Sequence, residues 1–167
     1  MSIEDVAQKV NSYNTTYVCL TGGEPLEQPE EVFQFCERMQ QMCISVLLET
    51  SGCYRIGAFL EFEDILIDCD VKPPSADAKI PFHPDNLEHL NSKKVYLKFV
   101  ISTWEDYYWM KEWLKINHPT CQVWLQADFK GKVTPKLLAE QIMKDGLSGV
   151  RIGIQLHKLL WGDKRGV

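Results

Sequence analysis

The run Thr21-Gly22-Gly23-Glu24-Pro25 follows an apolar stretch at 17–20 and precedes a helix-like segment that starts near Pro29. Paired glycines at the end of a strand let the backbone come close to a ligand, because neither residue has a Cβ in the way. Glu24 adds a carboxylate, and Pro25 adds a stiff turn. Taken alone, the run is equally compatible with an ordinary turn between a strand and a helix.

Other polar side chains stand where further predicted strands end. They are Glu49, Thr50 and Ser51 after the second strand, Asp68, Asp70 and Lys72 after the third, Ser102 after the fourth, Gln126 and Asp128 after the fifth, and Gln155 and His157 after the sixth. The carboxyl ends of parallel strands gather on one face of a sheet or barrel. The sequence therefore predicts a single ligand site built from residues that are far apart in the chain.

These side chains offer specific chemistry. The backbone amides of Gly22 and Gly23, the hydroxyls of Thr50 and Ser51, and the ammonium of Lys72 suit the polar end and the ribose of a ligand. His157 suits a general acid or a hydrogen-bond donor to a planar base. The alternatives are a surface ion-pairing role for Lys72 and a structural role for His157.

The elements that must position these residues alternate along the chain. Hydrophobic periodicity predicts strands at 17–20, 44–48, 65–67, 95–101, 122–125 and 150–154, and helices at 2–13, 29–42, 56–62, 102–116 and 134–146. Ser2 with Asp5, Ser102 with Glu105, and Thr134 before Pro135 are typical of helix starts. Alternating strands and helices indicate an α/β fold with parallel strands. We find no domain boundary and treat residues 1–167 as one domain.

Composition excludes several classes of protein. The chain has 167 residues, 45% of them hydrophobic, and a net charge of −5. No apolar run approaches the roughly 20 residues needed to cross a bilayer, and the N-terminus lacks signal-peptide features, so we expect a cytoplasmic protein without a membrane partner. The acidic charge argues against direct nucleic-acid binding. Phosphate-binding Gly-x-x-x-x-Gly-Lys and Gly-x-Gly-x-x-Gly runs and a serine nucleophile elbow are absent from the sequence.

The cysteines and the aromatic residues favour structural roles. The six cysteines show no Cys-x-x-Cys pair and no compact metal-ligand spacing. We predict core packing for Cys19, Cys36 and Cys43, and leave a site role open for Cys53 and Cys69. The aromatic residues of 104–114 recur at helical spacing, which favours core or subunit packing over base stacking.

Five segments carry a resemblance to a known family, in the order in which they occur. They are Leu-Thr-Gly-Gly-Glu-Pro-Leu at 20–26, Glu-Thr-Ser-Gly at 49–52, Asp-Val-Lys-Pro-Pro at 70–74, Leu-Lys-Phe-Val at 97–100, and Gln-Leu-His-Lys-Leu-Leu-Trp-Gly-Asp at 155–163. The first two are shared by many radical S-adenosylmethionine enzymes, whereas the third and the last are much narrower. Together they resemble the 7-carboxy-7-deazaguanine synthases along the whole chain.

The resemblance implies a fold, cofactors and a reaction. That family is a partial (βα) barrel of the radical S-adenosylmethionine type, which binds S-adenosylmethionine at a [4Fe-4S] cluster and uses Mg²⁺. It converts 6-carboxytetrahydropterin into 7-carboxy-7-deazaguanine by radical ring contraction, on the way to queuosine-type tRNA bases. By resemblance, the cofactor contacts are Gly22, Gly23, Glu24, Thr50, Ser51, Lys72 and Gln126, and the pterin contact is His157.

One feature departs from the family pattern. The cluster cysteines of the family precede the helix that leads into Gly-Gly-Glu-Pro, and no Cys-x-x-x-Cys-x-x-Cys run occurs here. Since Met1 falls within that helix, we expect a truncated core that lacks the first strand and the cluster loop. Such a core would contain no catalytic or metal-ligating residue, and we expect it to be inactive as an isolated chain. A misplaced start site, a truncation and a natural remnant all remain open. Without the first strand, an apolar edge of the sheet would be exposed. We expect a second copy of the chain to cover that edge, which predicts a homodimer.

Two other interpretations stay open. A glycyl-radical activating enzyme shares Gly-Gly-Glu-Pro and the Asp-x-Lys loop, although the ending at 155–163 and the lack of a ferredoxin-like cysteine insertion speak against it. A non-catalytic binding or assembly module would keep the cleft without the chemistry.

Overall fold

Six parallel strands form the centre of the molecule. The computed structural model describes residues 1–162 and 164. Its strands are β1 (Tyr17–Leu20), β2 (Ser45–Thr50), β3 (Ile65–Asp70), β4 (Val95–Ile101), β5 (Gln122–Ala127) and β6 (Val150–Gly153). They pair in sequence order from β1 to β6, and every neighbouring pair is parallel. The predicted α/β class and its parallel strands are confirmed.

Helices connect the strands in alternation. The α-helices are α1 (Ile3–Ser12), α2 (Pro29–Gln41), α3 (Trp104–Asn117), α4 (Pro135–Lys144) and α5 (Leu156–Trp161), and the short 3₁₀ turns are η1 (Pro25–Glu27), η2 (Gly57–Glu61), η3 (Pro74–Ala76) and η4 (Pro84–His89). No helix in the described part of the chain is both long and apolar enough to span a bilayer.

Local capping explains where the helices begin. The Ser2 hydroxyl accepts from the Asp5 amide while the Asp5 carboxylate accepts from the Ser2 amide, and Thr134 caps α4 before Pro135 at its first turn. The α3 cap differs from the prediction by one residue, because Thr103 pairs reciprocally with Asp106. Ser102 instead donates its amide to the same Asp106 carboxylate.

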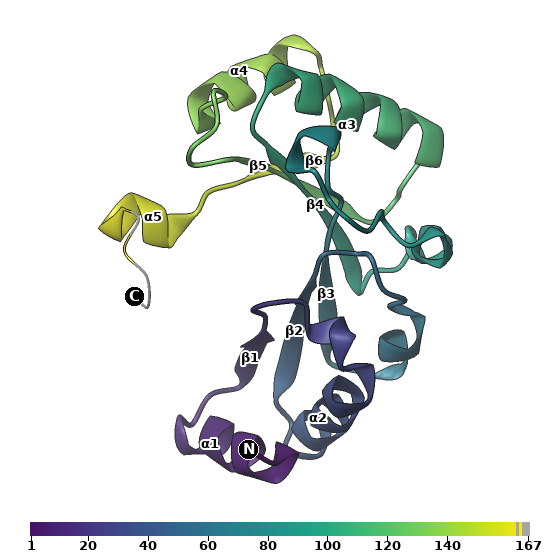
Figure 1. Cartoon of the computed structure of the whole chain (residues 1–167), viewed down its shortest axis with the longest axis vertical. Helices are drawn as coiled ribbons and strands as arrows, with labels where there is room; N and C mark the ends of the chain where they lie inside the picture. Colours follow the sequence, from purple (N-terminus) through teal and green to yellow (C-terminus); the bar gives the residue numbers. More distant parts are fainter. Residues whose placement is uncertain (163, 165–167) are drawn as a thin grey trace.

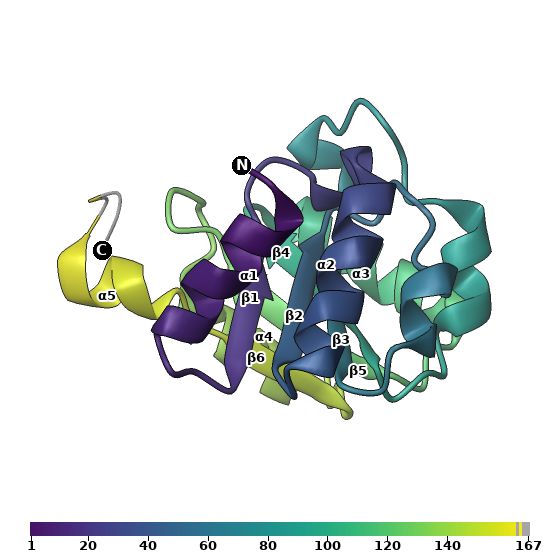
Figure 2. The same ribbon diagram turned by 90° about the horizontal axis from the view of Figure 1, so that it is seen from below.

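The unbroken strand order fixes the architecture. Right-handed crossovers between strands in sequential order place their helices on the same face, as in a barrel, whereas a doubly wound sheet reverses order. In Figure 1 the sheet twists from β1 near α1 and α2 to β5 near α3 and α4. Figures 1 and 2 show α5 standing apart from these helices.

The two faces of the sheet differ in chemistry. Leu48, Ile67, Leu97, Phe99 and Leu125 are fully buried in the core that the sheet forms with the helices. Residues that alternate with them face the other way and include charged and polar side chains, which line the pocket described below. Each of these strands therefore packs one face into the core and presents the side chains of its other, polar face to the site.

Three predictions about individual residues need correction. Cys36 is buried as predicted, but Cys19 and Cys43 are exposed. Cys19 lies on the polar face of β1, where its thiol donates to Glu49, and Cys43 follows the end of α2 at a φ of 56°. The sixth strand ends at Gly153, so Gln155 and His157 belong to the start of α5, which periodicity did not predict. Asp163 of the resembling segment lies outside the described residues.

A buried asparagine fixes the loop that follows β2. Asn86 is 1% exposed, accepts from the Ile56 amide, and donates to the carbonyls of Gly52 and Tyr54. Gly52 has a φ of 74°, and an added Cβ would lie 2.8 Å from the Phe82 ring. The loop after β2 is thus held from behind by the segment that precedes β4.

We predict that Asn86→Ala destabilises the fold by about 3 kcal/mol, because the Ile56 amide and the Tyr54 carbonyl lose their partner, while the Gly52 carbonyl keeps only the His83 amide. Urea unfolding followed by circular dichroism measures the change. The matched control is Asn91→Ala at an exposed position, which we expect to change stability by less than about 0.5 kcal/mol. Equal effects of the two substitutions would contradict the role assigned to Asn86.

Candidate functional site

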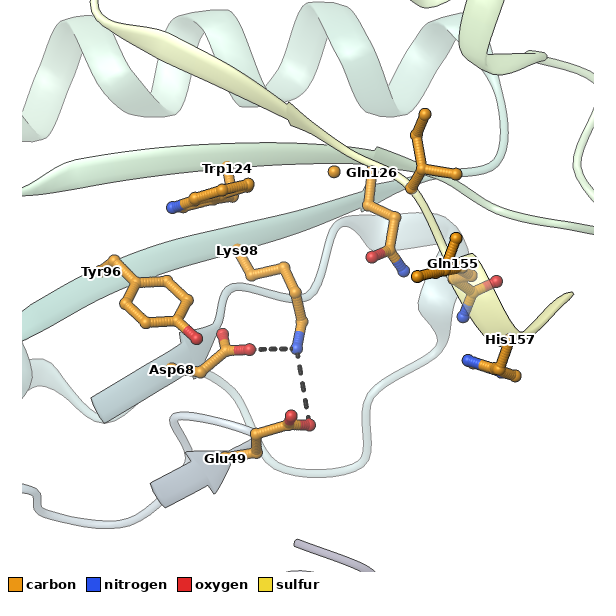
Figure 3. A pocket seen from close by; sticks show the side chains of 11 residues that line it. Glu49, Asp68, Tyr96, Lys98, Trp124, Gln126, Gln155 and His157 are labelled. Carbon is orange, nitrogen blue, oxygen red and sulfur yellow. Dashed lines mark hydrogen bonds and ion pairs between the residues drawn. The ribbon is translucent and has the colours of Figure 1, made fainter. Parts of the chain in front are cut away.

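A pocket of about 420 Å³ lies on the polar face of the sheet and extends from Tyr96 and Trp124, near the starts of β4 and β5, to the carboxyl ends of β2, β5 and β6 (Figure 3). Its lining comes from β2 to β6 and the start of α5: Glu49, Asp68, Tyr96, Lys98, Trp124, Gln126, Gly153, Ile154, Gln155, Leu156 and His157. The pocket is large enough for a small heterocyclic ligand. Of the residues selected as cofactor or substrate contacts, Gln126 and His157 line it.

A buried ion pair forms one end of the pocket. The Lys98 ammonium donates to Asp68 Oδ2 at 2.6 Å, and it lies 4.0 Å from both Glu49 Oε2 and Asp70 Oδ1. Pairing in the sheet explains this arrangement, because Glu49 is the register partner of Asp68 and Asp70 is that of Lys98. Three carboxylates from two strands therefore surround one ammonium from the next.

Burial controls how these groups titrate. Desolvation raises the pKa of Asp68 to about 6, although the hydrogen bond and the charge of Lys98 oppose that change. Burial works to lower the pKa of Lys98, but the charge of Asp70 and the hydrogen bond with Asp68 outweigh it and raise that pKa above its ordinary value. Lys98 is consequently a cation near neutral pH.

Aromatic side chains line the same part of the pocket. The rings of Tyr96 and Trp124 lie 6.2 Å apart, and the Arg151 guanidinium lies 5.5 Å from the Trp124 ring. Burial, together with the charge of Asp68, raises the pKa of the Tyr96 hydroxyl. The Trp124 indole nitrogen is buried and has no hydrogen-bond partner among the described residues. These rings supply flat apolar surface beside the charged groups.

Neutral polar groups lie at the other end of the pocket. In Figure 3, Gln126 comes from β5, while Gln155 and His157 come from the segment that follows β6. Amide and imidazole groups both donate and accept hydrogen bonds. The pocket thus has a charged end and a neutral end.

Glu24 joins the ends of the first two strands. One of its oxygens accepts from the Thr50 hydroxyl at 2.7 Å and the Leu26 amide at 3.0 Å, and the other accepts from the amide and the hydroxyl of Ser51. Burial works to raise the pKa of Glu24, but these hydrogen bonds outweigh it and lower that pKa. The structure therefore brings three predicted site residues, Glu24, Thr50 and Ser51, into one hydrogen-bonded group.

The remaining predicted residues lie near these two groups in the sheet. Gly22 and Gly23 have φ values of 92° and 59°, and a Cβ added to either would meet no atom within 4 Å. This loop has the positive φ angles that glycine adopts and leaves open space for a ligand. Lys72 forms an ion pair with Asp70, the carboxylate that also approaches Lys98.

The described residues do not gather a metal-binding group. Within residues 1–162 and 164, no cluster of three or more His, Cys, Asp or Glu side chains is placed to hold a metal ion. The described side chains therefore gather no ligand set that fits an iron–sulfur cluster.

The prediction from sequence found part of the pocket. Gln126 and His157 do line it, as expected of residues at strand ends. Glu49, Asp68 and Gln155 line it too, and all three are among the strand-end residues named from sequence. Lys98 pairs with Asp68, yet it was not selected as a site residue. It stands inside the strongly apolar strand at 95–101. A charge in such a strand requires a partner, which is the signal that could have identified Lys98.

Comparisons with known proteins agree with the resemblance in sequence. The chain is 35% identical to the 7-carboxy-7-deazaguanine synthase of Thermoplasma acidophilum over 151 residues, which cover 90% of this chain and 70% of that protein. It is 32% identical to the synthase of Koribacter versatilis, with 85% and 67% covered, and 30% identical to that of Leptospira interrogans, with 100% and 74% covered. A scan of protein-family profiles gave no match.

A solved structure supports the fold. The crystal structure of QueE from Escherichia coli matches with a TM-score of 0.66 and 16% sequence identity. The match covers 93% of this chain and 64% of that chain. At this identity the similarity concerns the fold alone, and it confirms the partial barrel with its parallel strands.

We predict that Asp68→Asn changes how stability depends on pH. Between about pH 4 and pH 6 the folded protein keeps a proton on Asp68 that the unfolded chain has released, so the unfolding free energy falls as pH rises. Across this range, the unfolding free energy of the wild type should fall by about 2 to 3 kcal/mol relative to that of the variant. Urea unfolding at pH steps from about 4 to 7 measures the difference.

Asp106→Asn provides a control of opposite sign. Burial works to raise the pKa of Asp106, but hydrogen bonds from Ser75, Thr103 and Ser102 lower it. The wild type should therefore gain stability over its Asp106 variant as pH rises through the titration of the unfolded carboxyl group. If the unfolding free energy of the wild type relative to Asp68→Asn also rose with pH, the effect of burial on the Asp68 carboxylate would be refuted.

Proposed function

Because the chain belongs to the 7-carboxy-7-deazaguanine synthase family, we propose that its pocket binds the family's pterin substrate, 6-carboxytetrahydropterin, for ring contraction to 7-carboxy-7-deazaguanine. The observation that carries this proposal is the position of the pocket in a member of this family. It lies on the polar face of the barrel strands and reaches their carboxyl ends, where such folds hold their ligands.

The lining of the pocket supports a ligand of this kind. A pterin is flat, carries amide-like donors and acceptors on one ring, and bears a carboxylate on the other. Tyr96 and Trp124 offer flat surfaces, Lys98 and Glu49 offer an ammonium and a carboxylate, and His157 can hold an anionic or carbonyl oxygen. The chain can therefore bind and orient a pterin and exclude water from its buried edge.

The cofactor-binding role rests on the second group of residues. We propose that Gly22, Gly23, Glu24, Thr50, Ser51, Lys72 and Gln126 hold S-adenosylmethionine, which supplies the radical that starts the rearrangement when it is bound to a reduced cluster. The Glu24 group keeps the two loops in register, and the open Gly22 and Gly23 amides are the groups free to approach the cofactor.

We assign no reductive step to these residues. The [4Fe-4S] cluster and Mg²⁺ are implied by the family, but the described side chains gather no ligand set that fits the cluster. Ring contraction would therefore need cluster ligands in addition to these 167 residues, and we expect none from the isolated chain.

We further propose that the protein acts in the cytoplasm as a homodimer. The edge strand β1 exposes Tyr17 at 69%, and α5 exposes Leu159 at 71% and Leu160 at 58%. Exposed apolar groups along an edge and an outlying helix are typical of surfaces that a second chain covers. Sedimentation equilibrium that finds only monomer would refute the dimer.

Binding of 6-carboxypterin, a fluorescent oxidised analogue of the substrate, tests the proposed function. We expect saturable quenching, competition by 7-carboxy-7-deazaguanine, and affinity at least about tenfold lower in Lys98→Gln, because that variant loses a charged donor. Lys111→Gln is the matched control, since Lys111 also donates to a carboxylate at 2.6 Å but lies outside the pocket. Binding that is absent in the wild type would overturn the proposed function.

Calorimetric titration with S-adenosylmethionine tests the cofactor-binding half. We expect weak binding or none for the isolated chain, because an iron–sulfur cluster would hold the amino and carboxylate groups of the cofactor. Tight binding at one molecule per chain, lost in Gly23→Val but kept in Gly146→Val, would contradict the expected dependence on the cluster. Both glycines have a positive φ and open space at the Cβ position.

A further inference from the structure

The charged end of the pocket contains more hydrogen-bonding capacity than the protein uses. An ammonium group has three N–H donors, and Lys98 uses one of them, on Asp68. Its distances of 4.0 Å to Glu49 and Asp70 are too long for hydrogen bonds. The Lys98 side chain is only 19% exposed, so its two remaining donors lie at the inner end of the pocket.

Glu49 places an acceptor beside these donors. Among the described residues, its carboxylate accepts hydrogen bonds only from the Cys19 thiol at 3.4 Å and the Thr21 hydroxyl at 3.3 Å. A carboxylate has about four acceptor positions, so capacity remains on the side that lines the pocket. Lys98 and Glu49 therefore present a donor and an acceptor 4.0 Å apart to one ligand.

Asp68 determines where the Lys98 ammonium lies. The Asp68 side chain is 6% exposed and is enclosed by the neighbouring strands, where Glu49 and Tyr96 are its register partners. It therefore cannot turn out into the pocket without losing its contact with Lys98. A long lysine side chain has several rotatable bonds, and a fixed carboxylate removes much of that freedom.

The three carboxylates also decide which part of a ligand enters this end. A ligand carboxylate beside Lys98 would meet the negative charges of Glu49, Asp68 and Asp70. A lactam, with a carbonyl oxygen next to a ring N–H, matches one donor and one acceptor and brings no charge. The ligand's own carboxylate then belongs at the neutral end, near Gln126 and His157 (Figure 3).

We infer that Lys98 and Glu49 recognise the lactam edge of the ring, with Lys98 donating to the carbonyl oxygen, Glu49 accepting from the adjacent N–H, and Asp68 acting as the positioning residue for Lys98. This inference rests on the proposed function, because it assigns an orientation to the pterin. It identifies Asp68 as a residue that influences specificity through the position of Lys98.

A ligand with the opposite hydrogen-bonding pattern tests the inference. In 2,4-diaminopteridine-6-carboxylate an amino group replaces the ring carbonyl of 6-carboxypterin, and the adjacent ring nitrogen becomes an acceptor. We expect the wild type to bind 6-carboxypterin at least about tenfold more tightly, since in the proposed orientation the diamino compound places a donor against Lys98 and an acceptor against Glu49. Fluorescence titration of both compounds gives the ratio of affinities.

Two variants assign the preference to the proposed residues. Lys98→Gln, whose amide can donate or accept, and Asp68→Asn, which frees Lys98, should each reduce the ratio to less than about threefold. Asp145→Asn is the matched control, because Asp145 accepts from Lys111 at 2.6 Å outside the pocket, and it should keep the wild-type ratio. A ratio is informative here because a general loss of stability lowers both affinities alike.

Each outcome bears on a different conclusion. Equal binding of the two compounds by the wild type overturns the lactam assignment and leaves the proposed function intact. A wild-type preference that survives in both variants overturns the roles of Lys98 and Asp68. If Asp68→Asn does not fold, the wild-type ratio and Lys98→Gln still decide. Failure of the wild type to bind either compound overturns the proposed function and this inference with it.

Discussion

The arrangement of the site depends on one buried cation in the middle of a parallel sheet. Lys98 interrupts the apolar strand β4, and its ammonium is stable there only because Asp68, Asp70 and Glu49 lie on the two preceding strands. A shift of register by one residue would turn these side chains to the hydrophobic core. The ion pair thus favours the register that also brings the strand ends together at the pocket.

A second polar group performs a similar task at the edge of the sheet. Glu24 ties the loop after β1 to the loop after β2 through Thr50 and Ser51, while Asn86 holds the latter loop from behind. Neither connection depends on a ligand. The loops that resemble cofactor-binding segments are therefore organised by the chain itself, which reduces the entropy that a ligand would lose on ordering them.

The fold could be predicted from the sequence because its signals are local. Period-2 and period-3.6 patterns, with caps at Ser2 and Thr134, identify nearly every element, and the alternation of elements identifies parallel strands. Exceptions occur where local signals compete. Cys43 lies on the apolar stripe of α2 but just beyond its end, and α5 lacks a side-chain cap and a buried face that would mark it.

The site was less accessible to the same reasoning, since it depends on which residues are opposite one another. Strand ends identified Gln126 and His157, and they also identified the Glu24 group, whose members bond mainly to one another. They did not identify Lys98 as a site residue, because pairing with Asp68 requires the register between β3 and β4. Charge placement in apolar strands supplies the missing rule: two opposite charges in neighbouring parallel strands indicate both a register and a polar cavity beside it.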